Sequence, residues 1–253
     1  MTYDLRLGSC LDPVTGLASL ADDSVDVTIT DPPYEAEAHT QGRRQKGKAT
    51  TPGGGDSFRE VLDSSLPFAA ITPKERIEVA NQIARVTRHR AVVFCQAEAI
   101  GAWKEAFNAA GMPYRRSMPW TKPDAMPSLH GRWPGQSYEA IVLAMHPAAP
   151  SCPVGGKSKR YEFTRAVGQA PHPTTKPLTL MRELVGDFTR PGDLVLDCYT
   201  GSGTTGLACN QLGRHFLGWE LSPEYHAIAL RRLRGDEAKP RPEQPSLFDR
   251  RPA

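Results

Sequence analysis

Residues 194–206 read LVLDCYTGSGTTG, an apolar run that passes directly into a glycine-rich turn. A short, continuous apolar run such as Leu194–Cys198 is typical of a buried strand in a parallel sheet. The turn after it lets a ligand approach the backbone closely and directs the free N–H groups of a helix start at that ligand. The segment therefore predicts a strand, a turn and a helix of an α/β protein, with a ligand bound at the turn.

The same strand pattern recurs along the chain and alternates with helical patterns. Four further apolar runs predict buried parallel strands: Val25–Thr30, Ala91–Cys95, Ala140–Met145 and His215–Trp219. Helices are predicted from four segments, which are the capping box Thr72-Pro73-Lys74-Glu75, Glu98–Ala110, Lys176–Phe188 and the start Ser222-Pro223-Glu224. The alternation predicts a Rossmann-like α/β fold with a doubly wound, mostly parallel sheet.

The glycine turn and an acidic residue after it indicate an adenosine cofactor. Glu220 ends the next predicted strand, where a carboxylate can accept hydrogen bonds from both ribose hydroxyls. The spacing Gly201-x-Gly203-x-x-Gly206 also matches the dinucleotide fingerprint, so a nicotinamide cofactor and S-adenosylmethionine both remain open on this motif. Asp197, which ends the strand before the turn, suits the positive charge of S-adenosylmethionine better than it suits a pyrophosphate.

A second motif, Thr30-Asp31-Pro32-Pro33-Tyr34, follows directly on the strand Val25–Thr30. Two prolines cannot continue a central strand, so they hold the chain just beyond the carboxyl edge of the sheet, where α/β proteins bind ligands. Asp31 and the Pro32 carbonyl offer two hydrogen-bond acceptors, and Tyr34 offers an aromatic face. A planar exocyclic amine needs this set, with two acceptors for its N–H groups and a ring for stacking.

With both motifs in place, the chain resembles the β-group of the amino-methylating DNA methyltransferases, which modify adenine N6 or cytosine N4 at specific sites. The resemblance runs from Tyr3 to about Leu233, and it rests on a permuted motif order with the catalytic block first and the cofactor loop last. The matching segments are Tyr3–Tyr34, Ala91–Cys95, Pro119–Pro123, Tyr138–Val142, His172–Pro177, Asp197–Thr205 and Phe216–Glu220. The chain departs from the family at Gly8-Ser9-Cys10, because the family usually has Asp after this glycine. The contact that this Asp would make with the adenine of the cofactor is then left for Ser9 or a neighbouring residue.

The resemblance implies an S-adenosylmethionine-dependent methyltransferase fold that holds two ligands. Asp31, Pro32, Pro33 and Tyr34 are expected to hold a target base that is flipped out of duplex DNA. The expected cofactor-binding residues are Asp197, Tyr199, Gly201, Ser202, Gly203, Thr204, Thr205, Glu220, Thr175 and Lys176. No metal is expected at the site.

The expected reaction moves the methyl group of S-adenosylmethionine to N6 of adenine. In this family Asp-Pro-Pro-Tyr preceded by Thr is more typical of adenine enzymes, whereas cytosine N4 enzymes more often have Ser in the place of Asp31. Four alternatives remain: a cytosine N4 enzyme, an RNA or protein methyltransferase, a nicotinamide oxidoreductase, and a DNA-binding module with an inactive site. A role in restriction–modification would require a nuclease on another protein.

The net charge of +3 is unevenly distributed. Residues 39–59 and 147–176 each carry +4, which leaves −5 for the rest of the chain. All of these charges except that of Lys176 lie in two long segments without a strand or helix pattern, 35–66 and 147–171. The two segments are predicted to be DNA-binding insertions in a single catalytic domain of residues 1–234. The expected phosphate contacts are Arg43, Arg44, Lys46, Lys48, Lys157, Lys159, Arg160 and Arg165.

Composition and the remaining motifs bear on location and partners. Hydrophobic residues make up 39% of the chain, which is enough for a core and excludes a disordered chain. The chain has no secretory signal, no apolar run near the roughly 18–20 residues of a membrane span, and five cysteines without a CxxC pair, so a cytoplasmic protein without disulfides or zinc is expected. Residues 235–253 are expected to form a flexible tail. The tail contains Gln244-Pro245-Ser246-Leu247-Phe248, which resembles the short peptide that docks bacterial proteins on the replication sliding clamp. The family resemblance adds a homodimer as a further state to test.

Overall fold

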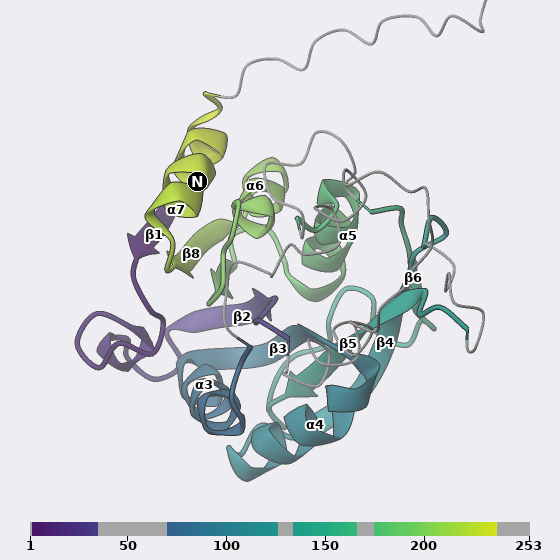
Figure 1. The fold of residues 1–253 in the computed structure, drawn as a ribbon. Helices are drawn as coiled ribbons and strands as arrows, with labels where there is room; N and C mark the ends of the chain where they lie inside the picture. The colour runs from purple at the N-terminus through teal and green to yellow at the C-terminus, as the bar shows by residue number, and fades with distance from the viewer. Residues whose placement is uncertain (1, 35–69, 126–133, 166–174, 237–253) are drawn as a thin grey trace, which may run out of the picture.

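The computed structural model describes residues 2–34, 70–125, 134–165 and 175–236. Its centre is an eight-stranded sheet in the order β1-β8-β7-β2-β3-β5-β4-β6 (Figure 1). In chain order the strands are β1 (Tyr3–Leu7), β2 (Val25–Thr30), β3 (Thr87–Cys95), β4 (Tyr114–Thr121), β5 (Tyr138–Met145), β6 (Tyr161–Glu162), β7 (Leu194–Asp197) and β8 (His215–Glu220). All five predicted strands are present, and β1, β4 and β6 join them.

Strand direction follows the prediction in one part of the sheet and departs from it in another. The neighbours β1, β8, β7, β2 and β3 are parallel. The prediction of a parallel strand at Ala140–Met145 is wrong, because β5 runs antiparallel to both β3 and β4. A strand that is buried on both faces has the same continuous apolar pattern in either direction, so hydropathy does not distinguish the two.

Helices cover both faces of the sheet (Figure 1). One face carries η1 (Leu17–Ser19), α3 (Pro73–Val86), η2 (Ala97–Ala99) and α4 (Ile100–Ala109), and the other carries α5 (Leu178–Phe188), α6 (Thr204–Gln211) and α7 (Pro223–Arg234). The predicted capping box opens α3, since the Thr72 hydroxyl accepts from Glu75 N–H at 3.2 Å and the Glu75 carboxylate accepts from Thr72 N–H at 2.8 Å. Ser222 caps α7 as predicted.

Two apolar cores lie on the two faces of the sheet. The core under α3 and α4 includes Val25, Ile83, Val93, Trp103 and Phe107, all at most 1% exposed. The core under α5 and α6 includes Val27, Ile29, Leu184, Phe188 and Phe216, which are equally buried. Because β2 contributes to both cores, it is fixed at the centre of the molecule.

The chain leaves the centre of the sheet in two opposite directions. From β2 it passes through α3 to β3, and from β7 it passes through α6 to β8, which lies on the other side. β2 and β7 are neighbours, with Val27 opposite Val195 and Thr28 opposite Leu196. Their carboxyl ends therefore meet at a topological switch point, which is where open α/β sheets bind ligands.

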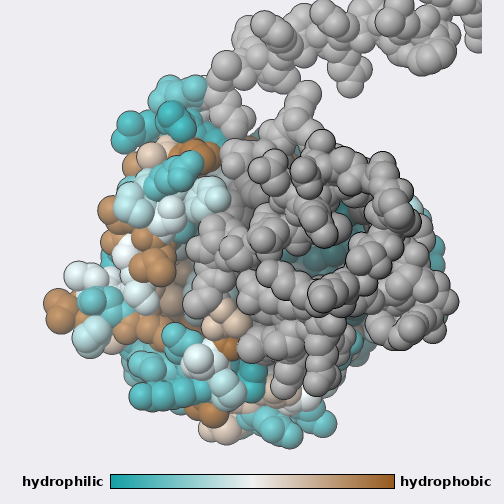
Figure 2. Space-filling view, viewed as in Figure 1, coloured by the Kyte–Doolittle hydropathy of each residue, from teal (hydrophilic) through white to brown (hydrophobic). Residues whose placement is uncertain are grey.

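Apolar residues on the described surface are scattered. On the face shown in Figure 2 they lie among polar residues, and the exposed large side chains of the described residues include Leu7, Val14 and Leu221. Single exposed apolar residues are ordinary on protein surfaces, so the homodimer stays a prediction. Across the described residues no helix is both long and apolar enough to span a membrane.

Several predictions fall outside the described residues. These are the insertion 35–66 with its basic residues, the end of the insertion 147–171, and the tail with Gln244–Phe248.

Candidate active site

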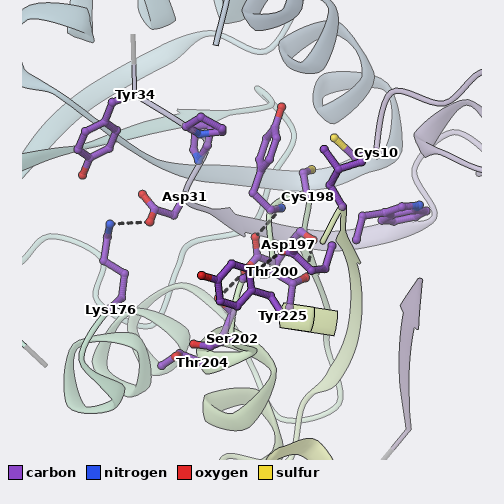
Figure 3. Close-up of a pocket in the computed structure, with 18 of the residues that line it drawn as sticks. Cys10, Asp31, Tyr34, Lys176, Asp197, Cys198, Thr200, Ser202, Thr204 and Tyr225 are labelled. Atoms are coloured by element: carbon purple, nitrogen blue, oxygen red, sulfur yellow. Dashed lines mark hydrogen bonds and ion pairs between the residues drawn. The ribbon is translucent and has the colours of Figure 1, made fainter. Parts of the chain in front are cut away.

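A cavity of about 530 Å³ opens at the switch point between β2 and β7 (Figure 3). This volume lies in the range of about 300–1,000 Å³ that is usual for small-molecule sites. Its walls come from both sequence motifs, the Asp31–Tyr34 block after β2 and the Asp197–Thr205 turn after β7. The structure thus brings together two predicted sites that lie far apart in the sequence.

Asp197 organises the glycine turn from the end of β7. One carboxylate oxygen accepts from the Thr30 hydroxyl at 2.8 Å and from Tyr199 N–H at 3.1 Å, and the other accepts from the Thr205 hydroxyl at 2.6 Å. Burial raises the pKa of Asp197 to about 6, although these three hydrogen bonds oppose the shift. The side chain lines the cavity, so a cationic ligand there would draw it into its charged form.

The glycines of the turn serve a tight, left-handed backbone. Gly201 has φ +55° and Gly203 has φ +85°, a region that residues with a Cβ rarely adopt. A Cβ on Gly203 would also lie 2.9 Å from the Cβ of Ala229 in α7. The turn therefore depends on glycine at position 203 for two separate reasons.

Glu220 holds the turn from the end of β8. Its carboxylate accepts from Gly201 N–H at 2.7 Å and from Ser222 N–H at 2.8 Å. These bonds fix the carboxylate at the cavity wall. A carboxylate oxygen has two lone pairs, so each oxygen keeps an acceptor site for a ribose hydroxyl.

The remaining predicted cofactor residues also lie at the cavity. Thr175 and Ser202 are joined through their hydroxyl groups at 3.2 Å. The guanidinium of Arg232 donates to the Ser202 carbonyl at 2.7 Å and to the Thr204 hydroxyl at 3.1 Å, so α7 supports the turn from behind. Thr175, Tyr199, Ser202, Thr204 and Thr205 are all part of the cavity wall.

The Asp31–Tyr34 block presents a charged and an aromatic group to the same cavity (Figure 3). One oxygen of Asp31 accepts from Lys176 Nζ at 2.5 Å, whereas its other oxygen, Oδ1, is buried and has no hydrogen-bond partner among the described residues. Burial raises the pKa of the Asp31 carboxyl, and Lys176 opposes that shift. A buried acceptor without a partner is costly, so Oδ1 fits a position where a ligand N–H completes the site.

Lys176 lies with the Asp31–Tyr34 block rather than on the glycine turn. Its ammonium is 2.5 Å from Asp31 and 3.3 Å from Glu139, and it is 5.6 Å from the centre of the Tyr34 ring. Burial disfavours its charge, but the two carboxylates raise the pKa of Lys176 above the usual value for lysine. Its predicted cofactor role stays a prediction, and the contacts place its charge at Asp31.

Sequence reasoning missed two site residues, Glu139 and Lys122. Glu139 accepts from the Tyr34 hydroxyl and pairs with Lys122, and both residues line the cavity. Each belongs to a segment that carries the family resemblance, but neither was assigned a role. An available signal was a carboxylate at the very start of a fully apolar strand, where an unpaired charge would be costly.

The described basic residues of the second insertion are in different settings. Lys157 is exposed, and Arg160 is exposed beside Glu162. Lys159 pairs with Glu183 at 2.6 Å and Asp187 at 2.8 Å. Arg165 pairs with Asp124 at 3.1 Å at the edge of the cavity. The predicted phosphate contacts remain a prediction, and Lys159 differs from the others in pairing with two carboxylates of the protein.

Solved structures of known proteins have the same architecture. The chain is similar to the crystal structure of the M1.HpyAVI–SAM complex, with 25% identity, a TM-score of 0.66, and coverage of 92% of this chain and 100% of that one. It also has the fold of the cytosine-N4-specific PvuII DNA methyltransferase, with 15% identity, a TM-score of 0.67, and coverage of 92% and 86%. The fold and the site thus define the class of Rossmann-like S-adenosylmethionine-dependent methyltransferases.

Within that class the sequence identifies the family. The model of the N6/N4 methyltransferase family, described as DNA methylase, matches residues 25–231, and the chain belongs to this family. A relative in sequence is the type II methyltransferase M.XycI of Xanthomonas campestris pv. cyanopsidis, 34% identical over 150 residues, which are 54% of this chain and 50% of the relative. The chain thus spans about half the length of the curated relatives that it matches.

Proposed function

We propose that this protein transfers the methyl group of S-adenosylmethionine to the exocyclic N6 of an adenine that is flipped out of duplex DNA. The observation that carries the proposal is the buried Asp31 Oδ1, an acceptor without a partner among the described residues, in a cavity shared with the glycine turn. An exocyclic amine supplies the N–H that this oxygen lacks.

The residues of the cavity fit S-adenosylmethionine as the cofactor. The Glu220 carboxylate suits the ribose hydroxyls, and the buried Asp197 carboxylate suits a cationic ligand. The cofactor supplies an activated methyl group on a sulfonium. The similar M1.HpyAVI structure is itself a complex with this cofactor.

The chain's own residues orient the target amine. Asp31 Oδ1 and the Pro32 carbonyl accept its two N–H groups, and the Tyr34 ring stacks on the base. The nitrogen forms the new N–CH₃ bond as the S–CH₃ bond breaks, S-adenosylhomocysteine leaves, and the amine then loses one proton to water. The charged Asp31 carboxylate favours the positive charge that develops on the nitrogen.

Adenine rather than cytosine is favoured by the Thr30-Asp31-Pro32-Pro33-Tyr34 sequence. Cytosine N4 methylation is the second candidate, because the same acceptors suit any exocyclic amine and the fold is shared with a cytosine-N4-specific enzyme. Expression in a host without DNA methylation, followed by modification-sensitive sequencing, tests both candidates. N6-methyladenine at one sequence is the expected result, N4-methylcytosine would support the second candidate, and unmodified DNA would overturn both.

The role of Asp31 gives a direct test. In Asp31→Ala methyl transfer is expected to fall below detection, because the amine loses its charged acceptor, while S-adenosylmethionine still binds at the separate glycine turn. Methyl transfer is measured with radiolabelled cofactor and binding by calorimetry. Asp236→Ala, at an exposed position after α7, is the matched control and should retain full activity. Full activity in Asp31→Ala would contradict the assignment.

A further inference from the structure

Four charged side chains of alternating sign form a row that begins at Asp31 in the Asp31–Tyr34 block and continues through Lys176 and Glu139 to Lys122. Lys176 Nζ lies 2.5 Å from Asp31 and 3.3 Å from Glu139, and the other oxygen of Glu139 pairs with Lys122. The side chains of Lys176, Glu139 and Lys122 are 10%, 14% and 17% exposed. All four side chains line the cavity, and they come from four separate segments of the chain.

Glu139 is the member of this row with the most hydrogen-bond and ion-pair partners among the described residues. Besides both lysines, it accepts a hydrogen bond from the Tyr34 hydroxyl. Burial raises the pKa of Tyr34 well above its usual value, so the hydroxyl stays protonated and remains a donor. Glu139 therefore contacts Tyr34, the proposed stacking residue for the target base, and Lys176, which pairs with Asp31.

The charge of Glu139 matters because of the charge change that methyl transfer requires. Positive charge develops on the target amine, and Asp31 stabilises it. Lys176 alone would offset that stabilisation, since its ammonium is as close to Asp31 as a hydrogen bond allows. Glu139 balances Lys176, and without it the row would carry one net positive charge beside the developing cation.

This inference rests on the function proposed above. We propose that Glu139 is a positioning residue for methyl transfer. It fixes the Tyr34 ring and balances the charge of Lys176, so that the Asp31 carboxylate can stabilise the positive charge on the target amine. A purely structural role would instead be limited to neutralising two buried lysines. The two roles differ in what they do to the reaction once the protein is folded.

The test replaces Glu139 by Gln in the full chain. Gln keeps an acceptor for the Tyr34 hydroxyl and nearly the same volume, but it removes the charge. The single-turnover rate is expected to fall roughly 10²-fold, the loss typical of one misplaced electrostatic group, while the Kd for S-adenosylmethionine changes less than about twofold. Glu105→Gln, on the exposed side of α4, is the matched control and should keep the wild-type rate.

The pH profile of the rate separates the two roles. Glu139 raises the pKa of Asp31 by charge repulsion, so its removal should move the acid limb of the profile to lower pH. The charged or titratable groups that face Asp31 are Lys176 before α5, Glu139 on β5, Lys122 after β4, Tyr34 after β2 and Asp197 on β7. A rate within about threefold of wild type, or a lower rate with an unmoved acid limb, would overturn the inference.

A second variant guards against a folding defect in Glu139→Gln. Tyr34→Phe keeps the ring and removes only the hydroxyl that Glu139 holds. If the two residues act together, the double variant loses less activity than the product of the single losses. Independent losses would overturn the inference. If Glu139→Gln does not fold, Tyr34→Phe decides alone, because a wild-type single-turnover rate in that variant would show that the hydroxyl held by Glu139 has no part in positioning the ring.

Failure of this inference is distinguishable from failure of the proposed function. The wild-type protein is assayed first on unmethylated genomic DNA, and no incorporation would overturn the proposed function together with this inference. An active wild type with an unaffected Glu139→Gln variant would overturn the inference alone.

Discussion

The hydroxyl of Thr30 joins two motifs that lie 167 residues apart in the sequence. It donates to the Asp197 carboxylate at 2.8 Å and accepts from Cys198 N–H at 3.1 Å, and the residue is 1% exposed. One side chain thus links the end of β2, which leads into Asp31, to the end of β7, which leads into the glycine turn.

Thr30→Val tests this link, because it removes the hydroxyl and keeps the shape. The free energy of unfolding is expected to fall by about 1–3 kcal/mol, since a buried carboxylate oxygen and a buried N–H each lose a partner. Denaturant titration measures the change. Thr179→Val, at an exposed position of α5, is the matched control and should stay within about 0.5 kcal/mol of wild type. Equal stability of the Thr30 and Thr179 variants would contradict the link.

The pKa of Asp197 gives a prediction for cofactor binding. A cationic ligand binds better to the carboxylate than to the neutral acid, and burial places the pKa of Asp197 at about 6. As pH falls from 7.5 to 5 the side chain takes up a proton, so the affinity for S-adenosylmethionine should weaken by up to about tenfold. Calorimetry across this range measures the effect. Asp197→Asn should remove the pH dependence, and an equally steep dependence in that variant would contradict the assignment.

Site residues could be predicted from the sequence only where they belong to a recognisable motif. Asp31 and Asp197 lie in short motifs whose local sequence already indicates chemistry. Glu139 and Lys122 lie in ordinary sequence, and their partners come from other segments, so only the folded chain brings the charges together. The motif around Lys176 predicts a cofactor role, but the contacts of its ammonium are with Asp31 and Glu139.

At the scale of elements, the reversal of β5 is what places Glu139 in the site. Glu139 lies at the amino end of β5, and because β5 is antiparallel to β3, this end meets the carboxyl ends of the parallel strands. A parallel strand at Ala140–Met145, as predicted, would have put Glu139 at the opposite edge of the sheet. The error in strand direction and the missed site residue therefore have one cause.

The predicted strands and missed strands differ in their burial. The five predicted strands form the buried centre of the sheet and have mostly apolar sequences. β1 is an edge strand with exposed and half-buried residues, β4 begins with exposed residues, and β6 has only two residues. Hydrophobic pattern detects burial, so it is weakest at the edges of a sheet.

The glycine turn gives a prediction at this scale. Gly203→Ala is expected to lower the free energy of unfolding by at least about 1–2 kcal/mol, because its φ is +85° and a Cβ would lie 2.9 Å from that of Ala229. Gly101→Ala is the control, since it lies in α4 with open space around the added Cβ and should stabilise by about 0.5–1 kcal/mol. Thermal unfolding compares the two, and an equal stabilisation in both would contradict the account of the turn.

At the scale of the whole molecule, charge is expected to govern binding to DNA. The affinity for duplex DNA should fall with salt, and Lys157→Ala or Arg160→Ala should each reduce the slope of the logarithmic plot by about 1. Fluorescence anisotropy at several salt concentrations gives the slopes. Lys104→Ala, at an exposed position of α4, is the control and should leave the slope unchanged. Affinity that does not change with salt, or a control with the same loss of slope, would contradict a DNA-binding role for this segment.

The central place of β2 and β7 has a consequence for how the chain is made. In the finished sheet β2 pairs with β7 along one edge, yet β7 is synthesised 167 residues after Thr30, roughly 10–30 s later at usual rates of translation. During that time the emerging protein presents an apolar, unpaired strand edge in what will become its core, which is the form most prone to wrong pairing. Translation must therefore pass residue 197 before the two halves of the site can meet, and any ribosomal stall before that point leaves a nascent chain that needs protection from its neighbours.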